Sequence, residues 1–130
     1  MDLKIRIDPA RFGSQTVALA GRLDTDSCDE LDRQLVPLLA AAEIRTLVLD
    51  LADLAYISSA GIRSIFKARK ALTARNGKVL VVNPQPQIQK VFDVVKAVPM
   101  NEIFTSIAEA DAYLDAMQRK VLEGNEDDDL

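Results

Sequence analysis

The chain of 130 residues has no histidine and only one cysteine, Cys28. Without histidine, a Ser-His-Asp triad, a histidine general base and nearly every histidine-bearing zinc site are excluded. A single cysteine can form neither an internal disulfide nor a thiolate metal cluster. We therefore expect a protein that is not an enzyme and has no metal site and no cofactor. The composition is compatible with a reducing, intracellular compartment.

Excess charge is also small once the end of the sequence is set aside. The formal net charge is −4, and the four acidic residues at 126–129 account for all of it. A neutral body does not attract nucleic acid or an anionic membrane, so we expect neither as a direct partner. No apolar run of about 18 residues, as a membrane-spanning helix needs, is present. Met1 is not followed by the apolar segment of a signal peptide. We therefore expect a cytoplasmic protein without membrane insertion.

The length corresponds to a single domain. We assign residues 1–122 to this domain and residues 123–130 to an acidic tail that we expect to be disordered. Hydrophobic residues make up 48% of the chain and charged residues 28%, which is typical of a globular protein with a core of its own.

Short apolar segments predict the β-strands. They are residues 3–7, 16–20, 46–51 and 79–82, with 103–105 as a possible short edge strand. The first segment alternates apolar and polar residues. By contrast, Leu47-Val48-Leu49 within 46–51 and the whole of 79–82 are continuously apolar and predict strands buried on both faces. We expect the second strand to end at Gly21, and the first two strands to pair antiparallel because they are close in sequence.

Four segments have apolar residues at helical spacing. Their inward residues are Leu31, Leu35, Leu38, Leu39 and Ala42; Ile62, Ile65, Phe66 and Leu72; Ile88, Val91, Phe92 and Val95; and Ala110, Leu114, Met117 and Val121. Capping boxes at Ser27 and Ser106 predict two of the helix starts, Pro37 should bend the first helix, and Gly124 should end the last. The pattern predicts an α/β fold, with a mixed, mostly parallel sheet of four to five strands packed against about four helices.

The carboxyl ends of the parallel strands meet at one edge of the sheet, where sites in open α/β folds are usually found. Three loops, at residues 21–27, 53–61 and 83–87, should therefore come together. The most polar and constrained segment is 57–61, where Ser59 is placed to cap the next helix and to leave the amides of Gly61 and Ile62 free. A helix N-terminus accepts an added phosphate readily, so Ser59 is a candidate switch.

Simpler interpretations remain open at this edge. A serine before a helix is usually only a cap. The basic stripe of Arg63, Lys67 and Lys70 is either a solvated helix face or an aid to partner docking. Asp24 should lie near Ser59, where its carboxylate can accept a hydrogen bond from the hydroxyl or repel a phosphate.

Neighbouring groups carry weaker signals. Asp24 and Asp26 lack the further carboxylates of a divalent metal site, and Asp26 can compete with Ser27 as a cap. Cys28 is most simply a small residue of the first helical turn, although a reactive thiolate is possible there.

Several segments together resemble one known family. They are Gly21-Arg22-Leu23-Asp24, residues 47–51, residues 56–63 and Val91-Phe92-Asp93. This pattern is similar to the STAS family, whose best-known members are bacterial anti-sigma factor antagonists, and the similarity runs from about residue 3 to about residue 120. Alignment on Gly61 places the family's phosphoacceptor at Ser59, with Ser58 as second choice. Ser58 then stands at the family's Asp position and Ala60 at its second Ser/Thr position.

The resemblance implies phosphorylation-controlled partner switching. The unphosphorylated protein would bind an anti-sigma factor that is also a serine kinase and so free the sigma factor. Phosphorylation at Ser59 would abolish binding, and a phosphatase would reset the switch. The free protein is expected to be monomeric. The expected partner contacts are Asp24, Thr25, Ser58, Ala60, Gly61, Ile62, Arg63 and Lys67.

Two other functions stay open. STAS domains also serve as non-switching accessory subunits of lipid-transport or stress-signalling complexes, which would bind their partners whatever the state of Ser59. A small-ligand or nucleotide sensor using the same edge is less favoured, because no glycine-rich phosphate loop is present.

Overall fold

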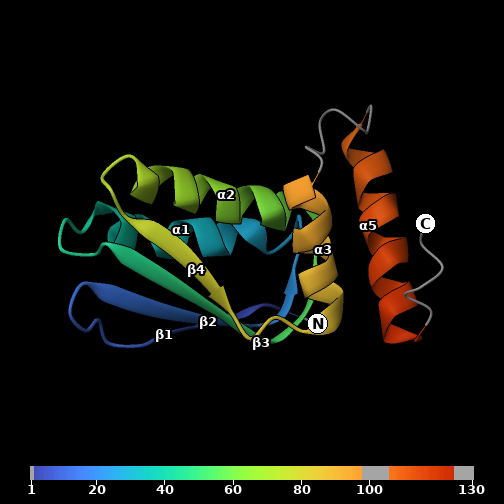
Figure 1. Cartoon of the computed structure of the whole chain (residues 1–130), viewed down its shortest axis with the longest axis horizontal. Helices are drawn as coiled ribbons and strands as arrows, with labels where there is room; N and C mark the ends of the chain where they lie inside the picture. The colour runs from blue at the N-terminus through green and yellow to red at the C-terminus, as the bar shows by residue number, and fades with distance from the viewer. Residues whose placement is uncertain (1, 98–105, 125–130) are drawn as a thin grey trace.

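The computed structural model describes residues 2–97 and 106–124 (Figure 1). Its elements are β1 Lys4–Ile7, β2 Ser14–Leu23, α1 Cys28–Ala40, β3 Thr46–Ile57, α2 Ser59–Thr73, β4 Lys78–Val82, α3 Pro86–Ala97 and α5 Ile107–Leu122. The predicted strand at 103–105 lies outside the described residues, as does the acidic tail from residue 125 onward.

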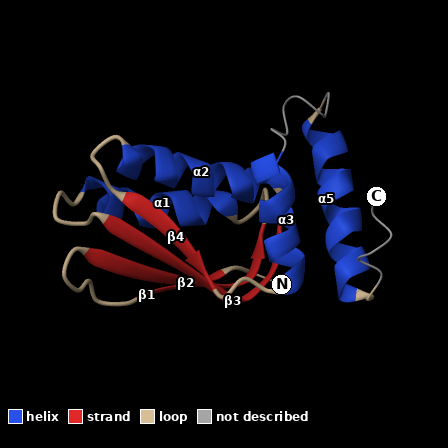
Figure 2. Cartoon of the chain, in the orientation of Figure 1, coloured by secondary structure: helices blue, strands red, loops and turns tan. Residues whose placement is uncertain are grey.

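The described strands form one sheet in the order β1-β2-β3-β4. β1 pairs antiparallel with β2, and the β2–β3 and β3–β4 pairs are parallel, as predicted. Figure 2 shows α1 and α2 along one face of this sheet, with α3 and α5 side by side at one end. The expected α/β fold with a mixed, mostly parallel sheet is confirmed.

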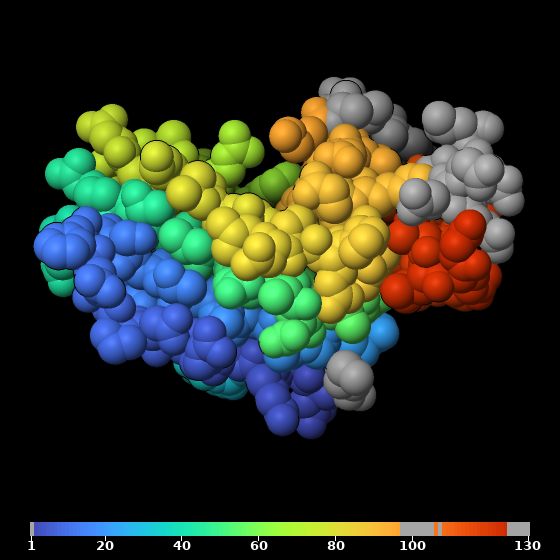
Figure 3. All heavy atoms as spheres, turned by 60° about the horizontal axis from the view of Figure 1, so that its bottom comes forward, coloured from blue at the N-terminus to red at the C-terminus, as the bar shows by residue number. Residues whose placement is uncertain are grey.

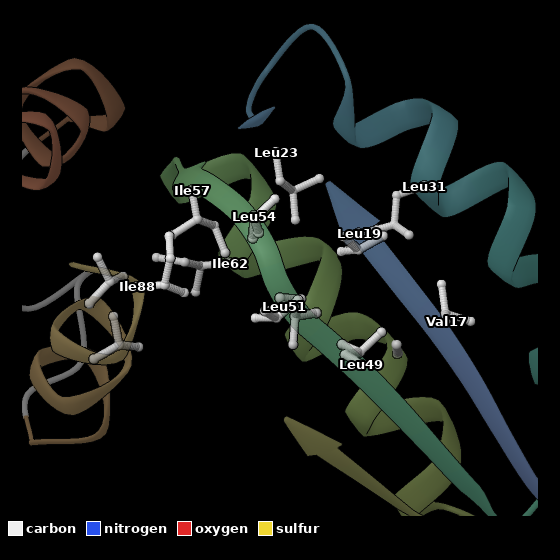
Figure 4. Close-up of a cluster of buried hydrophobic side chains, with 14 of the residues drawn as sticks. Val17, Leu19, Leu23, Leu31, Leu49, Leu51, Leu54, Ile57, Ile62 and Ile88 are labelled. Atoms are coloured by element: carbon white, nitrogen blue, oxygen red, sulfur yellow. The ribbon is translucent and has the colours of Figure 1, made fainter. Parts of the chain in front are cut away.

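The core lies between the sheet and the helices. Val17, Leu19 and Leu23 of β2 and Leu49 and Leu51 of the neighbouring β3 belong to a single cluster of buried apolar side chains (Figure 4). Apolar surface removed from water here supplies the main favourable free energy of folding.

Strands β3 and β4 are not buried on both faces, contrary to the prediction. Along β3 the fully buried Leu47 and Leu49 alternate with the half-buried Val48, and Leu80 of β4 is 42% exposed. The reason is that α1 and α2 cover only one face of the sheet.

Two strands are longer than predicted. β2 continues through Gly21 to Leu23, and β3 continues past Leu51 to Ile57. Gly21 has φ +100°, and a Cβ there would lie 2.0 Å from the carbonyl oxygen of Asp2. The positive φ and a nearby register shift accommodate the chain without ending the strand, so the glycine marks a bulge.

The helix boundaries test the capping predictions. Ser27 is the N-cap residue of α1, as predicted, but the capping box is not formed. Its hydroxyl makes no cap bond and instead donates to the carbonyl oxygen of Arg22 at 2.8 Å. α1 continues through Pro37 and ends at Ala40, which leaves the predicted inward residue Ala42 outside the helix and exposed. The cap at Ser106 is confirmed.

The carboxyl-terminal half of β3 extends beyond its neighbour β4, which pairs with it only as far as Asp50. Two glutamines, one just before α3 and one in its first turn, donate hydrogen bonds to backbone carbonyl groups of β3 that β4 leaves unpaired. Gln85 donates to the carbonyl oxygen of Ala52 at 2.8 Å, and Gln87 donates to that of Ala55 at 3.0 Å. These bonds satisfy edge groups that would otherwise need a further strand or water.

Candidate functional site

The ends of β2 and β3 meet at the start of α2. Leu23 and Ile57 are the last paired residues of the two strands. The next amide, that of Ser58, donates to the carbonyl oxygen of Leu23 at 2.9 Å and so turns the chain from strand into helix. The sheet edge thus presents the segment that the sequence singles out.

Ser58, and not Ser59, is the N-cap of α2. Its backbone is extended, with φ −100° and ψ 176°, and its Oγ accepts the Gly61 amide at 3.4 Å. The Ile62 amide donates to the Ser58 carbonyl oxygen at 3.0 Å. The prediction that Ser59 caps the helix and leaves the amides of Gly61 and Ile62 free is therefore wrong, because the helix begins one residue earlier.

Ser59 is the first residue of α2 and is only 3% exposed. Its amide donates to Oδ1 of Asp111 in α5 at 2.9 Å. Its Oγ is buried and has no hydrogen-bond partner in the described part of the chain. Buried hydroxyls usually have a hydrogen-bond partner, and this one therefore does not stabilise the fold through a hydrogen bond to the described residues.

Gly61 allows α2 to pack directly on the end of β2. A Cβ at this position would lie 2.7 Å from Cγ of Leu23 and 2.9 Å from the Leu23 carbonyl oxygen. The neighbouring Ala60 and Ile62 are also buried, at 8% and 2% exposure. These three residues hold the backbone of the site in place and leave little of their own side chains for a partner to touch.

Gln118 of α5 binds the last residue of β3 through both ends of its amide. Its Oε1 accepts the Ile57 amide at 3.1 Å, and its Nε2 donates to the Ile57 carbonyl oxygen at 2.8 Å. The side chain is 1% exposed. Sequence reasoning missed this residue and Asp111, although a polar residue beside Met117 in an apolar stripe is a signal for a buried contact.

Asp24 does not serve Ser59. Its Oδ1 accepts the amides of Asp26 at 3.1 Å and Ser27 at 3.2 Å, and its Oδ2 pairs with Nε of Arg22 at 3.4 Å. The expected hydrogen bond from the Ser59 hydroxyl is absent, because this loop uses the carboxylate for its own turn. The Ser27 hydroxyl in turn accepts the Asp24 amide at 2.9 Å, so Asp24 and Ser27 together organise the approach to α1.

Acidic groups surround Tyr56 beside the site. The guanidinium of Arg22 lies 3.9 Å above the centre of the Tyr56 ring. Burial is the main cause that raises the pKa of the Tyr56 phenol, and Asp115 and Asp111 raise it further, whereas Arg22 opposes them. The surroundings thus favour the neutral phenol and have a surplus of negative charge.

A groove of about 460 Å³ runs between α1 and α2 from the start of α2. Its lining residues are Cys28, Asp32, Ala60, Arg63, Ser64, Phe66 and Lys67. Lys67 pairs with Asp32 at 3.2 Å, and both Arg63 and Lys67 are exposed. Phe66, predicted to point inward, is 39% exposed on this groove. Burial raises the pKa of the Cys28 thiol, with Asp29 and Asp32 adding to the effect, which disfavours a reactive thiolate.

Two further observations concern residues 2–97 and 106–124. No group of three or more histidine, cysteine or acidic side chains there is arranged to hold a metal ion. No described helix combines the length and apolar character that crossing a bilayer requires.

Comparisons with known proteins identify the family of the chain. The sequence pattern of the STAS domain family matches residues 11–110 of the chain. The chain belongs to the STAS family. It is 30% identical over 82 residues to the putative anti-sigma factor antagonist BtrV of Bordetella bronchiseptica, covering 63% of this chain and 70% of BtrV. It is 24% identical over 76 residues to an anti-sigma F factor antagonist of Lysinibacillus sphaericus, covering 58% of this chain and 65% of the relative.

The same STAS fold is found in a solved structure. Unphosphorylated SpoIIAA, an anti-sigma factor antagonist, superposes with a TM-score of 0.61 at 19% identity, covering 69% of this chain and 82% of SpoIIAA. SpoIIAA of Bacillus has also been solved in a phosphorylated form, with the same TM-score.

Proposed function

We propose that this STAS protein is an anti-sigma factor antagonist that changes partners when Ser59 is phosphorylated. The observation that carries the proposal is the division of work between two adjacent serines. Ser58 caps α2, whereas the Ser59 hydroxyl has no partner among the described residues. A capping role therefore does not account for a serine at position 59, and no such role competes with phosphorylation of its hydroxyl.

The position of Ser59 suits a phosphate. A phosphoserine adds about −1.5 to −2 charges, and the positive end of a helix dipole favours such a group. The new charge would stand beside the Asp111 carboxylate, which accepts the Ser59 amide. The modification would therefore change the charge and the contacts of the partner-binding face more than the core.

The partner would bind the face formed by the start of α2 and the loop before α1. Among the expected contacts, Thr25, Arg63 and Lys67 are exposed and can touch a partner directly, and Asp24 is partly exposed. Arg63 and Lys67 suit an acidic partner surface, since charge complementarity guides docking. The expected contacts Ser58, Ala60, Gly61 and Ile62 are buried and would act by shaping the backbone.

The proposed cycle assigns the chemistry to the partners. An anti-sigma factor that is a serine kinase would transfer the γ-phosphoryl group of ATP to Oγ of Ser59, with ADP as leaving group and the hydroxyl proton passing to a kinase base. A phosphatase would hydrolyse the ester and restore the hydroxyl. The antagonist itself needs no cofactor, and we place the cycle in the cytoplasm with a monomeric free antagonist. The antagonist names of its relatives and the phosphorylated form of SpoIIAA support this cycle.

A pull-down from the native cell extract tests the proposal, with wild type, Ser59→Ala, Ser59→Glu and Ser58→Ala as baits. We expect wild type, Ser59→Ala and Ser58→Ala to capture a kinase-like protein that Ser59→Glu does not. Ser58→Ala controls for damage to the helix start. Capture of the same proteins by all four baits would contradict switching and favour a constitutive accessory subunit.

A further inference from the structure

We infer that α5 is a latch over the switch serine, and that Ser59 becomes accessible to a modifying enzyme only when α5 detaches from the start of α2. The inference rests on the proposed function only for the identity of the modification. Control of access to position 59 is a property of this fold and can be measured without any kinase.

The first contact of the latch is the carboxylate of Asp111. It accepts the Ser59 amide at 2.9 Å, so α5 reaches the residue that carries the switch hydroxyl. The hydroxyl beside this contact is buried, at 3% residue exposure. Phosphoryl transfer needs the attacking oxygen in line with the γ-phosphorus, and a buried oxygen cannot reach that position.

The second contact lies two residues before Ser59 in the chain. Gln118 makes a pair of hydrogen bonds with the backbone of Ile57, and Leu114 and Met117 add buried apolar surface on the same side of α5. Asp111 and Gln118 thus bind α5 to the junction of β3 and α2 at two places. Loss of either contact weakens the same docked state.

α5 lies at one end of the molecule, beside α3 and beyond the sheet (Figure 1). In Figure 3 its atoms lie beside those of α3 at that end. A peripheral helix can detach without unfolding the sheet, and such local openings need less free energy than global unfolding. α5 contributes Leu114 and Met117 to the apolar cluster, whose other fully buried members lie in the sheet, α1, α2 and α3.

Phosphorylation would also oppose return of the latch. A dianion on Oγ of Ser59 competes with the Asp111 carboxylate for the Ser59 amide, and the two like charges repel at short range. The modified protein would hold α5 away from α2, so the position of α5 would report the state of Ser59.

The test measures alkylation of a thiol placed at position 59, in a Cys28→Ser background that removes the native cysteine. The starting variant is Cys28→Ser with Ser59→Cys, and iodoacetamide is the probe. Asp111→Ala removes charge and acceptor, whereas Asp111→Asn removes the charge and keeps an acceptor oxygen. Gln118→Ala weakens docking without changing charge. Circular dichroism and urea unfolding establish that each variant is folded.

The latch predicts slow alkylation in the starting variant, compared with the same protein in urea. Asp111→Ala and Gln118→Ala should each raise the rate by about tenfold or more, as expected when a hydrogen bond to a charged or buried group is lost. Asp111→Asn should raise it by less than about threefold, which separates docking from the effect of charge on the thiolate. Rates within about twofold of the starting variant for both Asp111→Ala and Gln118→Ala would overturn the latch, and Ser59 could still be a phosphorylation site.

Discussion

Ser58 and Ser59 are adjacent and equally buried, at 3% exposure each, but within residues 2–97 and 106–124 only the Ser58 hydroxyl takes part in a hydrogen bond. One serine stabilises the helix start and the other leaves its hydroxyl unsatisfied. Folding therefore accounts for the hydroxyl of Ser58 and not for that of Ser59, which is the basis of the functional assignment.

The two serines should differ in their effect on stability. Ser58→Ala removes the N-cap of α2 and should lower the free energy of unfolding by about 1 kcal/mol. Ser59→Ala removes a hydroxyl that has no partner among the described residues and should change the free energy of unfolding by less than about 0.5 kcal/mol. Urea unfolding of both variants measures this difference, and a larger loss for Ser59→Ala would show that its hydroxyl has a structural role.

Gly61→Ala should destabilise the protein although alanine is the better helix former. The added Cβ would meet the side chain and carbonyl oxygen of Leu23, at 2.7 and 2.9 Å, and such overpacking lowers stability by about 1–3 kcal/mol. Gly124→Ala is the control. A Cβ at this position would meet nothing within 4 Å, so the φ of +83° is the unfavourable feature there. Equal unfolding midpoints for the Gly61 variant and wild type would contradict the packing described here.

Gln118→Ala should lower the free energy of unfolding by about 2–3 kcal/mol, because it leaves the buried amide and carbonyl of Ile57 without their partner. The adjacent Arg119 is exposed and pairs with Asp115 on the same helix. Arg119→Ala should therefore change stability by less than about 0.5 kcal/mol. Chemical denaturation compares the two, and similar losses would show that the Ile57 contact is not the stabilising one.

Tyr56 should give the protein an alkaline sensitivity. Burial, followed by Asp115 and Asp111, raises the pKa of its phenol in the folded state above the ordinary value of 10.0, against the opposing effect of Arg22. The proton is held more tightly in the folded state. The stability that this contributes is complete below the unfolded pKa and is lost as the pH rises through the folded pKa.

Tyrosinate absorbance in a Tyr113→Phe background follows the Tyr56 titration alone, since the chain has two tyrosines. We expect its midpoint to fall to a lower pH when the protein is unfolded in urea. Replacement of Tyr56 by Phe should reduce the alkaline loss of stability. Identical midpoints in the folded and unfolded protein would contradict the environment assigned to Tyr56.

Local patterns in the sequence predicted the fold and the region of the site. The apolar periodicity located every described helix and strand. The short link between the first two strands gave the antiparallel pair, and the helices between the later strands gave the parallel pairs. Boundaries were less accurate. A pattern of apolar residues does not show that Gly21 is a bulge within β2, or that β3 extends to Ile57, because both depend on backbone pairing with another segment.

The contacts of α5 could not be predicted from the sequence. Asp111 is 52 residues from Ser59, and Gln118 is 61 residues from Ile57. Such pairs depend on how a peripheral helix docks, and local patterns contain no information on that. The cap was misassigned for a related reason: two consecutive serines satisfy the same local rule, and only the backbone angles of Ser58 distinguish them.

The most direct test of the central claim is phosphotransfer from the purified kinase-like partner and ATP to this protein, followed by peptide mass spectrometry and a binding assay. The account predicts phosphate on Ser59 in wild type and in Ser58→Ala, none on Ser59→Ala, and loss of partner binding by the phosphorylated protein. Phosphate transfer to Ser59→Ala at the wild-type level, or unchanged binding after phosphorylation of Ser59, would contradict it.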